Sequence, residues 1–185
     1  MIEPVFTIAN QLTMLRMALV PPLVLLVLAR EFQWALVVYV VAGLTDALDG
    51  FVARHGHQST TLGAMLDPVA DKILLGSAYV VLTWGSGVAC PLPPWLTVPL
   101  LFRDGMLVVG VVVVNLTVGR RVYHPSRLGK LSTALLVGTG GVALLVNTLG
   151  ECPPSLRWLY EVNLAMLIVA TVHYVYLVSE RASAR

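Results

Sequence analysis

Charged residues are scarce in this sequence, and their scarcity excludes an ordinary soluble domain. Only 12% of the residues are Asp, Glu, Lys or Arg, 57% are hydrophobic, and the mean hydropathy is strongly positive. A soluble domain carries about 25% charged residues. The alternating ten-residue segments of a membrane β-barrel are absent, and no polar linker or low-complexity tract divides the chain. We therefore expect one all-α membrane domain that covers residues 1–185.

Long apolar runs recur along the whole chain. A helix needs about 20 mostly apolar residues to cross a bilayer, and polar segments such as HGHQSTT, GRRVYHPSR and ECPPS separate the runs. Because the runs are not confined to the start, we expect no cleaved signal peptide. The pattern predicts a bundle of six transmembrane helices, at residues 12–30, 33–53, 62–84, 94–117, 128–149 and 156–178.

The basic residues predict the orientation of this bundle. Cytoplasmic connections of membrane proteins carry an excess of Lys and Arg. With the N-terminus inside, only Arg30 and Arg157 fall on the outer side. The residues counted toward the inner side are Arg16, Arg54, Arg120, Arg121, Arg127, Lys130, Arg181 and Arg185. We predict that both termini are cytoplasmic and that the protein lies in the inner (cytoplasmic) membrane of the cell.

Cysteine is also scarce, with Cys90 and Cys152 the two examples. Both fall in outward loops of the predicted topology. If that side is oxidising they can pair, and two unpaired cysteines near the membrane surface are the alternative.

Four of the ten acidic residues lie in one stretch, residues 46–72, DALDGFVARHGHQSTTLGAMLDPVADK. A carboxylate at the centre of a membrane helix costs about 2.5 to 3.5 kcal/mol, so such residues usually face a cavity or a partner. On the second predicted helix, one face carries Asp46, Asp49, Gly50 and Ala53. On the third, one face carries Gly63, Asp67 and Asp71. We expect these two faces to meet across a short cytoplasmic loop.

Divalent cations explain why so many carboxylates stand together. Unpaired carboxylates repel one another, whereas a hard cation accepts several oxygen ligands. Mg²⁺ is usually held by a few carboxylates, with its remaining positions left to water or to a substrate phosphate. The stretch therefore predicts a site for Mg²⁺ or Mn²⁺ and a phosphate-bearing substrate. Arg54 and Lys72 border the cluster and can compensate phosphate charge.

The same stretch resembles the signature of the CDP-alcohol phosphatidyltransferase family. The matching residues are Asp46-x2-Asp49-Gly50-x2-Ala53-Arg54-x8-Gly63-x3-Asp67-x3-Asp71. Upstream, Asn10-x2-Thr13-x2-Arg16 resembles the family's segment before the first membrane helix, although Ala9 stands where a proline is common. The resemblance extends over most of the chain, and six spans with a cytoplasmic site are also the family's architecture.

The resemblance implies transfer of a phosphatidyl group from CDP-diacylglycerol to an alcohol, with release of CMP. It implies two divalent metals held by Asp46, Asp49, Asp67 and Asp71, with Asp71 also the base for the acceptor hydroxyl. The residues assigned to the CDP and pyrophosphate part are Gly50, Ala53, Arg54, Gly63, Asn10, Thr13, Arg16 and Lys72. A homodimer among membrane lipids is implied as well, and no nucleic-acid partner is needed.

The acceptor alcohol must be predicted from residues outside the signature. Arg103-Asp104 resembles the Arg-Asp of the CMP-forming cardiolipin synthases, whereas phosphatidylglycerophosphate synthases usually have Arg-Glu and a second arginine where Val111 stands. A free phosphate dianion needs that cationic contact more than phosphatidylglycerol does. We therefore predict phosphatidylglycerol as acceptor and keep glycerol 3-phosphate as the alternative. The candidate acceptor-binding residues are Arg103, Asp104, Arg127 and Lys130.

Two other interpretations bear on these motifs. Arg103 and Asp104 can also form a local ion pair that makes two intramembrane charges tolerable. A cation transporter or channel would account for acidic residues at membrane depth, but it does not explain the Gly-x2-Ala-Arg frame or the fixed gap to Gly63. The paired His-x-Lys-x4-Asp motifs of phospholipase D-type cardiolipin synthases are absent.

Overall fold

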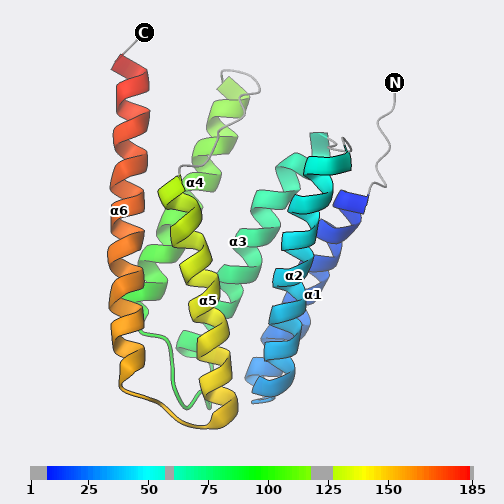
Figure 1. Cartoon of the computed structure of the whole chain (residues 1–185), viewed down its shortest axis with the longest axis vertical. Helices are drawn as coiled ribbons and strands as arrows, with labels where there is room; N and C mark the ends of the chain where they lie inside the picture. Colours follow the sequence, from blue (N-terminus) through cyan, green and yellow to red (C-terminus); the bar gives the residue numbers. More distant parts are fainter. Residues whose placement is uncertain (1–7, 57–60, 118–126, 184–185) are drawn as a thin grey trace. The chain divides into compact units, whose positions relative to one another are not determined.

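A computed structural model describes the backbone of residues 8–56, 61–117 and 127–183, and the side chains of 11–45, 69–109, 128–174 and Tyr176. Within these ranges the chain is all-helical (Figure 1). The six helices are α1 Ile8–Leu28, α2 Phe32–Gly56, α3 Thr61–Trp84, α4 Pro94–Thr117, α5 Arg127–Leu149 and α6 Ser155–Ser183. Each coincides with one of the six predicted segments, and the number of helices is confirmed.

Three stretches of the described residues are long and apolar enough to cross a membrane. They are Gln11–Leu28 in α1, Leu128–Leu149 in α5 and Ser155–Tyr174 in α6. A shorter apolar stretch, Phe32–Thr45, belongs to α2. The protein is thus an integral membrane protein.

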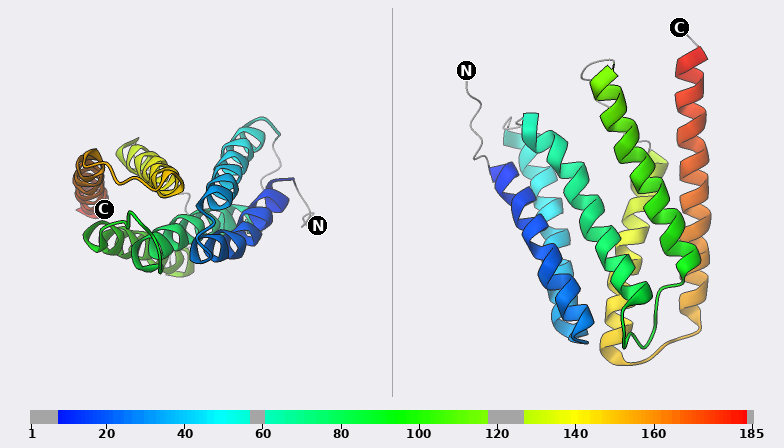
Figure 2. Two further views of the ribbon diagram at one scale, coloured as in Figure 1. Left: turned by 90° about the horizontal axis from the view of Figure 1, so that it is seen from below. Right: turned by 180° about the vertical axis from the view of Figure 1, so that it is seen from behind.

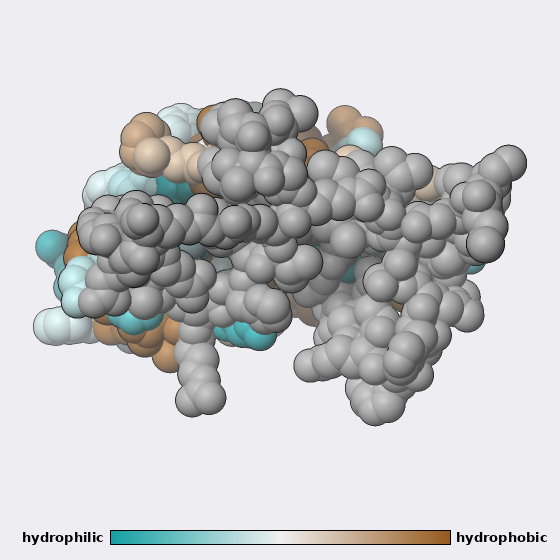
Figure 3. Space-filling view, turned by 90° about the horizontal axis from the view of Figure 1, so that it is seen from above, coloured by the Kyte–Doolittle hydropathy of each residue, from teal (hydrophilic) through white to brown (hydrophobic). Residues whose placement is uncertain are grey.

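Many large apolar side chains are exposed and several polar ones are buried, although the core itself is mostly apolar. Phe102 is 69% exposed, whereas its neighbours Arg103 and Asp104 are 7% and 6% exposed. Apolar side chains face outward on every helix, and brown hydrophobic atoms are visible at the margin of Figure 3. This arrangement leaves the polar groups inside, where lipid cannot reach them.

Several threonine hydroxyls within the helices are satisfied by the helix backbone. Thr83, Thr148 and Thr171 each donate to the carbonyl oxygen four residues earlier, at 2.7 to 2.9 Å. In lipid an unsatisfied polar group costs several kcal/mol, so this local bonding lets a threonine occupy a membrane helix.

The described residues form two compact units. The first comprises Met1–Leu92 and Gly140–Glu151, and the second comprises Pro93–Thr139 and Cys152–Arg185. The boundary falls within α5, whose first half belongs to the second unit.

In the first unit, α1 packs against both α2 and α3 (Figures 1 and 2). The buried face of α1 carries Thr13, Arg16, Leu23 and Val27. Arg16, which the sequence counts toward the cytoplasmic side, is a fully buried residue in the third turn of α1. The reason is its partner on α3, described below.

The second half of α5 completes the first unit. A Cβ atom placed on Gly140 would lie 2.6 Å from the hydroxyl oxygen of Tyr39, whose side chain is buried on α2. Asn147 holds the connection after α3, because its Oδ1 accepts from the Cys90 amide at 2.9 Å and its Nδ2 donates to the Cys90 carbonyl at 3.0 Å. The side-chain amide of Asn147 thus bonds both the N–H and the carbonyl of Cys90, as a backbone peptide group could.

Neither cysteine is a free thiol in the structure. Cys90 and Cys152 are both disulfide-bonded. Of the two alternatives that the sequence left open, the paired state is the one observed.

In the second unit, α6 packs against α4, and a buried amide joins α6 to the first half of α5. Asn163 Nδ2 donates to Thr139 Oγ1 at 2.7 Å and to the Leu159 carbonyl at 2.8 Å. Both side chains are 1% exposed. Such a bond between neighbouring membrane helices is worth about 0.6 to 2 kcal/mol.

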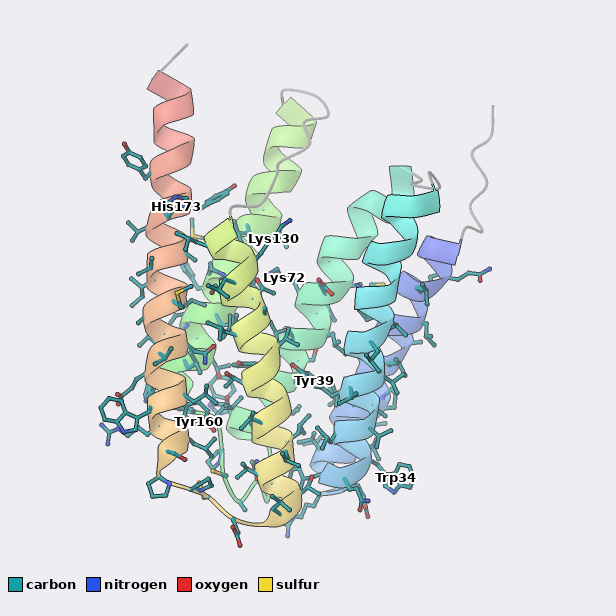
Figure 4. All side chains as sticks on the ribbon, in the orientation of Figure 1. Trp34, Tyr39, Lys72, Lys130, Tyr160 and His173 are labelled. Atoms are coloured by element: carbon teal, nitrogen blue, oxygen red, sulfur yellow. The ribbon has the colours of Figure 1, made fainter. Side chains whose placement is uncertain are left out.

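Each of the four tryptophans lies near a helix end. Trp34, Trp95 and Trp158 are in the first turns of α2, α4 and α6, Trp84 ends α3, and all four are exposed. Figure 4 shows Trp34 at the lower end of α2. Such positions suit tryptophan, which prefers the boundary between lipid and water.

Candidate active site

The predicted site residues divide according to whether their side chains are described. Asp46 and Asp49 lie in the last part of α2, and Asp67 lies in α3, so their helical setting is confirmed. The side chains outside the described set are those of Asn10, Asp46, Asp49, Gly50, Ala53, Arg54, Gly63, Asp67, Val111 and Arg127. The described ones are Thr13, Arg16, Asp71, Lys72, Arg103, Asp104 and Lys130.

Asp71, the predicted base, is held by an arginine from another helix. Arg16 Nη1 donates to Asp71 Oδ1 at 3.1 Å, across 55 residues of sequence. The Arg16 side chain is 0% exposed and the Asp71 side chain is 41% exposed. The pair therefore has a buried cation and a carboxylate that remains accessible.

Two other predicted residues lie near this pair in the chain. Thr13, one turn before Arg16 on the same face of α1, is also buried. Lys72 follows Asp71 on α3, is partly exposed and is labelled in Figure 4. Consecutive helix residues point about 100° apart, so Asp71 and Lys72 face different directions.

A second arginine–aspartate pair lies in α4. Arg103 Nε and Nη2 both donate to Asp104 Oδ1, at 3.0 and 2.8 Å. Arg103 Nη1 donates to Ser132 Oγ on α5 at 3.1 Å. Both side chains of the pair are 8% exposed, so the local ion pair considered from the sequence is what forms. Ser132 was not predicted; a single serine in an apolar helix gives little sequence signal for its partner.

Lys130 lies two residues before Ser132 on α5, near the start of that helix, and is exposed (Figure 4). His173, to which the sequence assigned no role, is on α6, and its Nδ1 has no hydrogen-bond partner among the described residues. Among the described side chains, no three His, Cys, Asp or Glu residues come together as a metal site.

The chemistry of Asp71 fits a divalent metal. Mg²⁺ and Mn²⁺ prefer carboxylate oxygen ligands, and the Asp71 carboxylate is accessible at 41% exposure. Its neighbour Arg16 supplies one positive charge, so the carboxylate is anchored without being enclosed.

Comparison with known proteins gives this geometry its context. Residues 6–176 match the family described as CDP-alcohol phosphatidyltransferase. The chain belongs to the CDP-alcohol phosphatidyltransferase family. The expected family is therefore confirmed, and the match includes α1 with Arg16, the acidic stretch and the Arg103–Asp104 pair.

The similar proteins carry two different names, cardiolipin synthase and phosphatidylglycerophosphate synthase. The chain is 36% identical to a CMP-forming cardiolipin synthase of Streptomyces coelicolor, over 92% of this chain and 88% of that protein. It is 44% identical to the human CMP-forming cardiolipin synthase over 61% of this chain, which corresponds to only 36% of the human protein. It is also 38% identical to a probable phosphatidylglycerophosphate synthase of Mycobacterium tuberculosis, over 68% of this chain and 60% of that protein.

Proposed function

We propose that this protein transfers a phosphatidyl group from CDP-diacylglycerol to the hydroxyl of phosphatidylglycerol, which gives cardiolipin and CMP. The observation that carries the proposal is an accessible Asp71 carboxylate, held by a buried arginine within the acidic stretch of a phosphatidyltransferase chain. The printed names of the relatives support the acceptor.

In the proposed reaction, an acceptor hydroxyl oxygen forms a bond to the β-phosphorus of CDP-diacylglycerol, the one that carries diacylglycerol. The bond from that phosphorus to the bridging oxygen breaks, and CMP leaves with the bonding electrons. The hydroxyl proton passes to Asp71, which acts as general base. A positioned base of this kind contributes about 10²- to 10⁴-fold to the rate.

We propose that Asp46, Asp49, Asp67 and Asp71 hold two divalent metals, Mg²⁺ or Mn²⁺. Such metals offset the negative charge that develops on the pyrophosphate. The residues proposed for the CDP part are Gly50, Ala53, Arg54, Gly63, Asn10, Thr13 and Lys72. Thr13 and Arg16 are buried on α1, and we propose that Arg16 supports this side of the site through its contact with Asp71.

The closed pair in α4 supports phosphatidylglycerol as acceptor. Asp104 compensates the charge of Arg103, and Ser132 takes a further donor of the same guanidinium. A neutral pair offers little to the dianion of glycerol 3-phosphate but tolerates a phosphodiester. We propose that Arg103 and Asp104 contribute as this pair, with Arg127 and Lys130 as the cationic residues for the acceptor.

Glycerol 3-phosphate is the second candidate acceptor, because one relative is named a probable phosphatidylglycerophosphate synthase. Cation transport, the alternative from another class, gives no account of the match over residues 6–176.

We further propose a cytoplasmic site in an inner-membrane protein with both termini cytoplasmic, and a homodimer. Reporter fusions at each terminus and the mass in nanodiscs test these points.

One experiment tests the reaction and the acceptor together. Purified protein receives CDP-diacylglycerol, Mn²⁺ or Mg²⁺, and one of phosphatidylglycerol, glycerol 3-phosphate, inositol phosphate or serine. We expect CMP release and cardiolipin, identified by mass, with phosphatidylglycerol alone. Product with glycerol 3-phosphate only would establish the alternative acceptor. No CMP with any acceptor, together with cation flux in sealed liposomes, would reject the enzyme in favour of transport.

A further inference from the structure

The contact between Arg16 and Asp71 is unusual in its asymmetry. Arg16 is 0% exposed, whereas 41% of the Asp71 side chain is exposed. The arginine therefore cannot reach a ligand in solution or at the membrane surface without leaving its packed position on α1. The aspartate can meet a ligand while the arginine stays in place.

The burial of Arg16 explains why this contact must be specific. Arg16 shares the packed face of α1 with Leu23 and Val27. A guanidinium remains charged in proteins, and a buried charge is tolerated only when it is paired and hydrogen-bonded. The Nη1 contact to Asp71 Oδ1 supplies the paired charge that this requirement calls for and one of the hydrogen bonds. Because α1 packs against α3, the contact between Arg16 and Asp71 joins two helices that already lie against each other.

We infer that Arg16 is a positioning residue for the reaction, which acts by holding the Asp71 carboxylate rather than by binding the nucleotide. The inference rests on the proposed function, in which Asp71 takes the proton of the acceptor hydroxyl. A general base works only within hydrogen-bond reach of that proton. Arg16 binds Oδ1 from the protein interior and so sets the direction in which the carboxylate faces the acceptor.

The kinetic signature separates this role from nucleotide binding. A misplaced catalytic group costs up to about 10²-fold in rate, and loss of an interaction made only in the transition state lowers kcat rather than raising KM. For Arg16→Met we expect kcat to fall about 10- to 100-fold. We expect KM for CDP-diacylglycerol to stay within about twofold. Arg16→Lys keeps the charge but not the planar fork, so it should recover part of kcat.

A second measurement does not depend on activity. The metal-free and substrate-free protein is unfolded with SDS in mixed micelles, as wild type, Arg16→Met, Asp71→Asn and the double variant. Since the two side chains are in contact, their effects should be non-additive. The matched control is Arg157→Met, which breaks the exposed Arg157–Glu161 pair on α6. An exposed pair of this kind contributes little, so neither stability nor turnover should change.

The results of these experiments distinguish a failure of the inference on Arg16 from a failure of the proposed function. A rise in KM for CDP-diacylglycerol with unchanged kcat in Arg16→Met would overturn the inference, because it would show a nucleotide contact. Strict additivity in the unfolding cycle would also overturn it. If Arg16→Met does not fold, Arg16→Lys and Arg16→Gln provide the same kinetic comparison. Absence of CMP from the wild type would reject the proposed function, whereas the unfolding cycle would still report on the Arg16–Asp71 contact.

Discussion

In each of the two units, the described side chains include a buried arginine bound to an aspartate, but the two pairs differ in what they leave accessible. In the first unit, Arg16 is enclosed and Asp71 is 41% exposed. In the second unit, Arg103 and Asp104 are both 8% exposed, and Ser132 takes a further donor. The first pair is open on the acidic side, and the second is closed.

This difference separates a chemical role from a structural one. A buried ion pair is weak support for stability, because desolvation of both ions offsets their attraction, yet loss of one partner is strongly destabilising. An open pair keeps a carboxylate available for a proton or a metal. A closed pair neutralises itself and makes two intramembrane charges tolerable. The predictions below test whether the two pairs differ in this way.

The largest effect is expected on turnover, from Asp71→Asn. Asparagine keeps an oxygen acceptor for Arg16 but cannot act as a base, so CMP release should fall at least about 100-fold. The buried Arg16 also loses its compensating charge, so the resistance to SDS unfolding should fall as well, although the asparagine oxygen can still accept from Arg16. CMP release with phosphatidylglycerol is the measurement, and an active variant would remove Asp71 from its role as base.

In the closed pair, Asp104→Asn should act mainly on stability. The buried Arg103 would lose its compensating charge, which costs about 3 to 5 kcal/mol of unfolding free energy. The double variant Arg103→Met with Asp104→Leu removes both charges and should recover most of the loss. SDS unfolding in mixed micelles measures both. A double variant as unstable as Asp104→Asn would show that the pair contributes more than charge balance.

Glycine packing in α5 offers a smaller effect that differs between the two units. Gly140→Ala places a Cβ atom 2.6 Å from the Tyr39 hydroxyl oxygen, and such overpacking costs about 1 to 3 kcal/mol. Gly138, in the second unit, has nothing within 4 Å of its Cβ position. Gly138→Ala is therefore the control and should stay within about 0.5 kcal/mol. Adding Tyr39→Phe to Gly140→Ala should restore part of the lost stability, and no recovery would point to another cause.

The smallest effect is expected from Ser132→Ala. It removes one acceptor of Arg103 but leaves the ion pair with Asp104, so the unfolding free energy should fall by about 1 kcal/mol. Thr133→Ala is the neighbouring control, because the Thr133 hydroxyl bonds only within α5, to the Gly129 carbonyl, among the contacts described. If both variants behave alike, the Ser132 contact does not support the pair.

The helices were predictable because membrane burial imposes length and composition. Pro94 and Thr117 are the observed ends of α4 and also the predicted ones, and a polar or proline-rich segment separates each helix from the next. The extension of α1 toward Ile8 was not predicted, because polar residues such as Asn10 and Gln11 interrupt the apolar run.

Side-chain partners were less predictable than helices. The charge rule counted Arg16 toward the cytoplasmic side by its place in the chain, and such a rule cannot predict its contact with a carboxylate 55 residues away. Arg103 and Asp104 are adjacent, so their ion pair was among the alternatives. The contacts of Asn147 with Cys90 and of Tyr39 with Gly140 depend on how distant helices pack. Asp46, Asp49, Asp67 and Asp71 all stay predictions as metal ligands.

The two hydrogen bonds between Asn147 and Cys90 bear on how the protein is synthesised. Cys90 and Asn147 are 57 residues apart, so the ribosome has completed α1, α2, α3 and α4 before it reaches the residue that fixes the loop after α3. The packing of Tyr39 against Gly140 also becomes possible only after that part of α5 has been synthesised. A nascent chain that ends after α4 therefore contains the helices of the first unit without the segment that completes it. Insertion of those helices into the membrane and completion of their packing are separate events in the biogenesis of this protein.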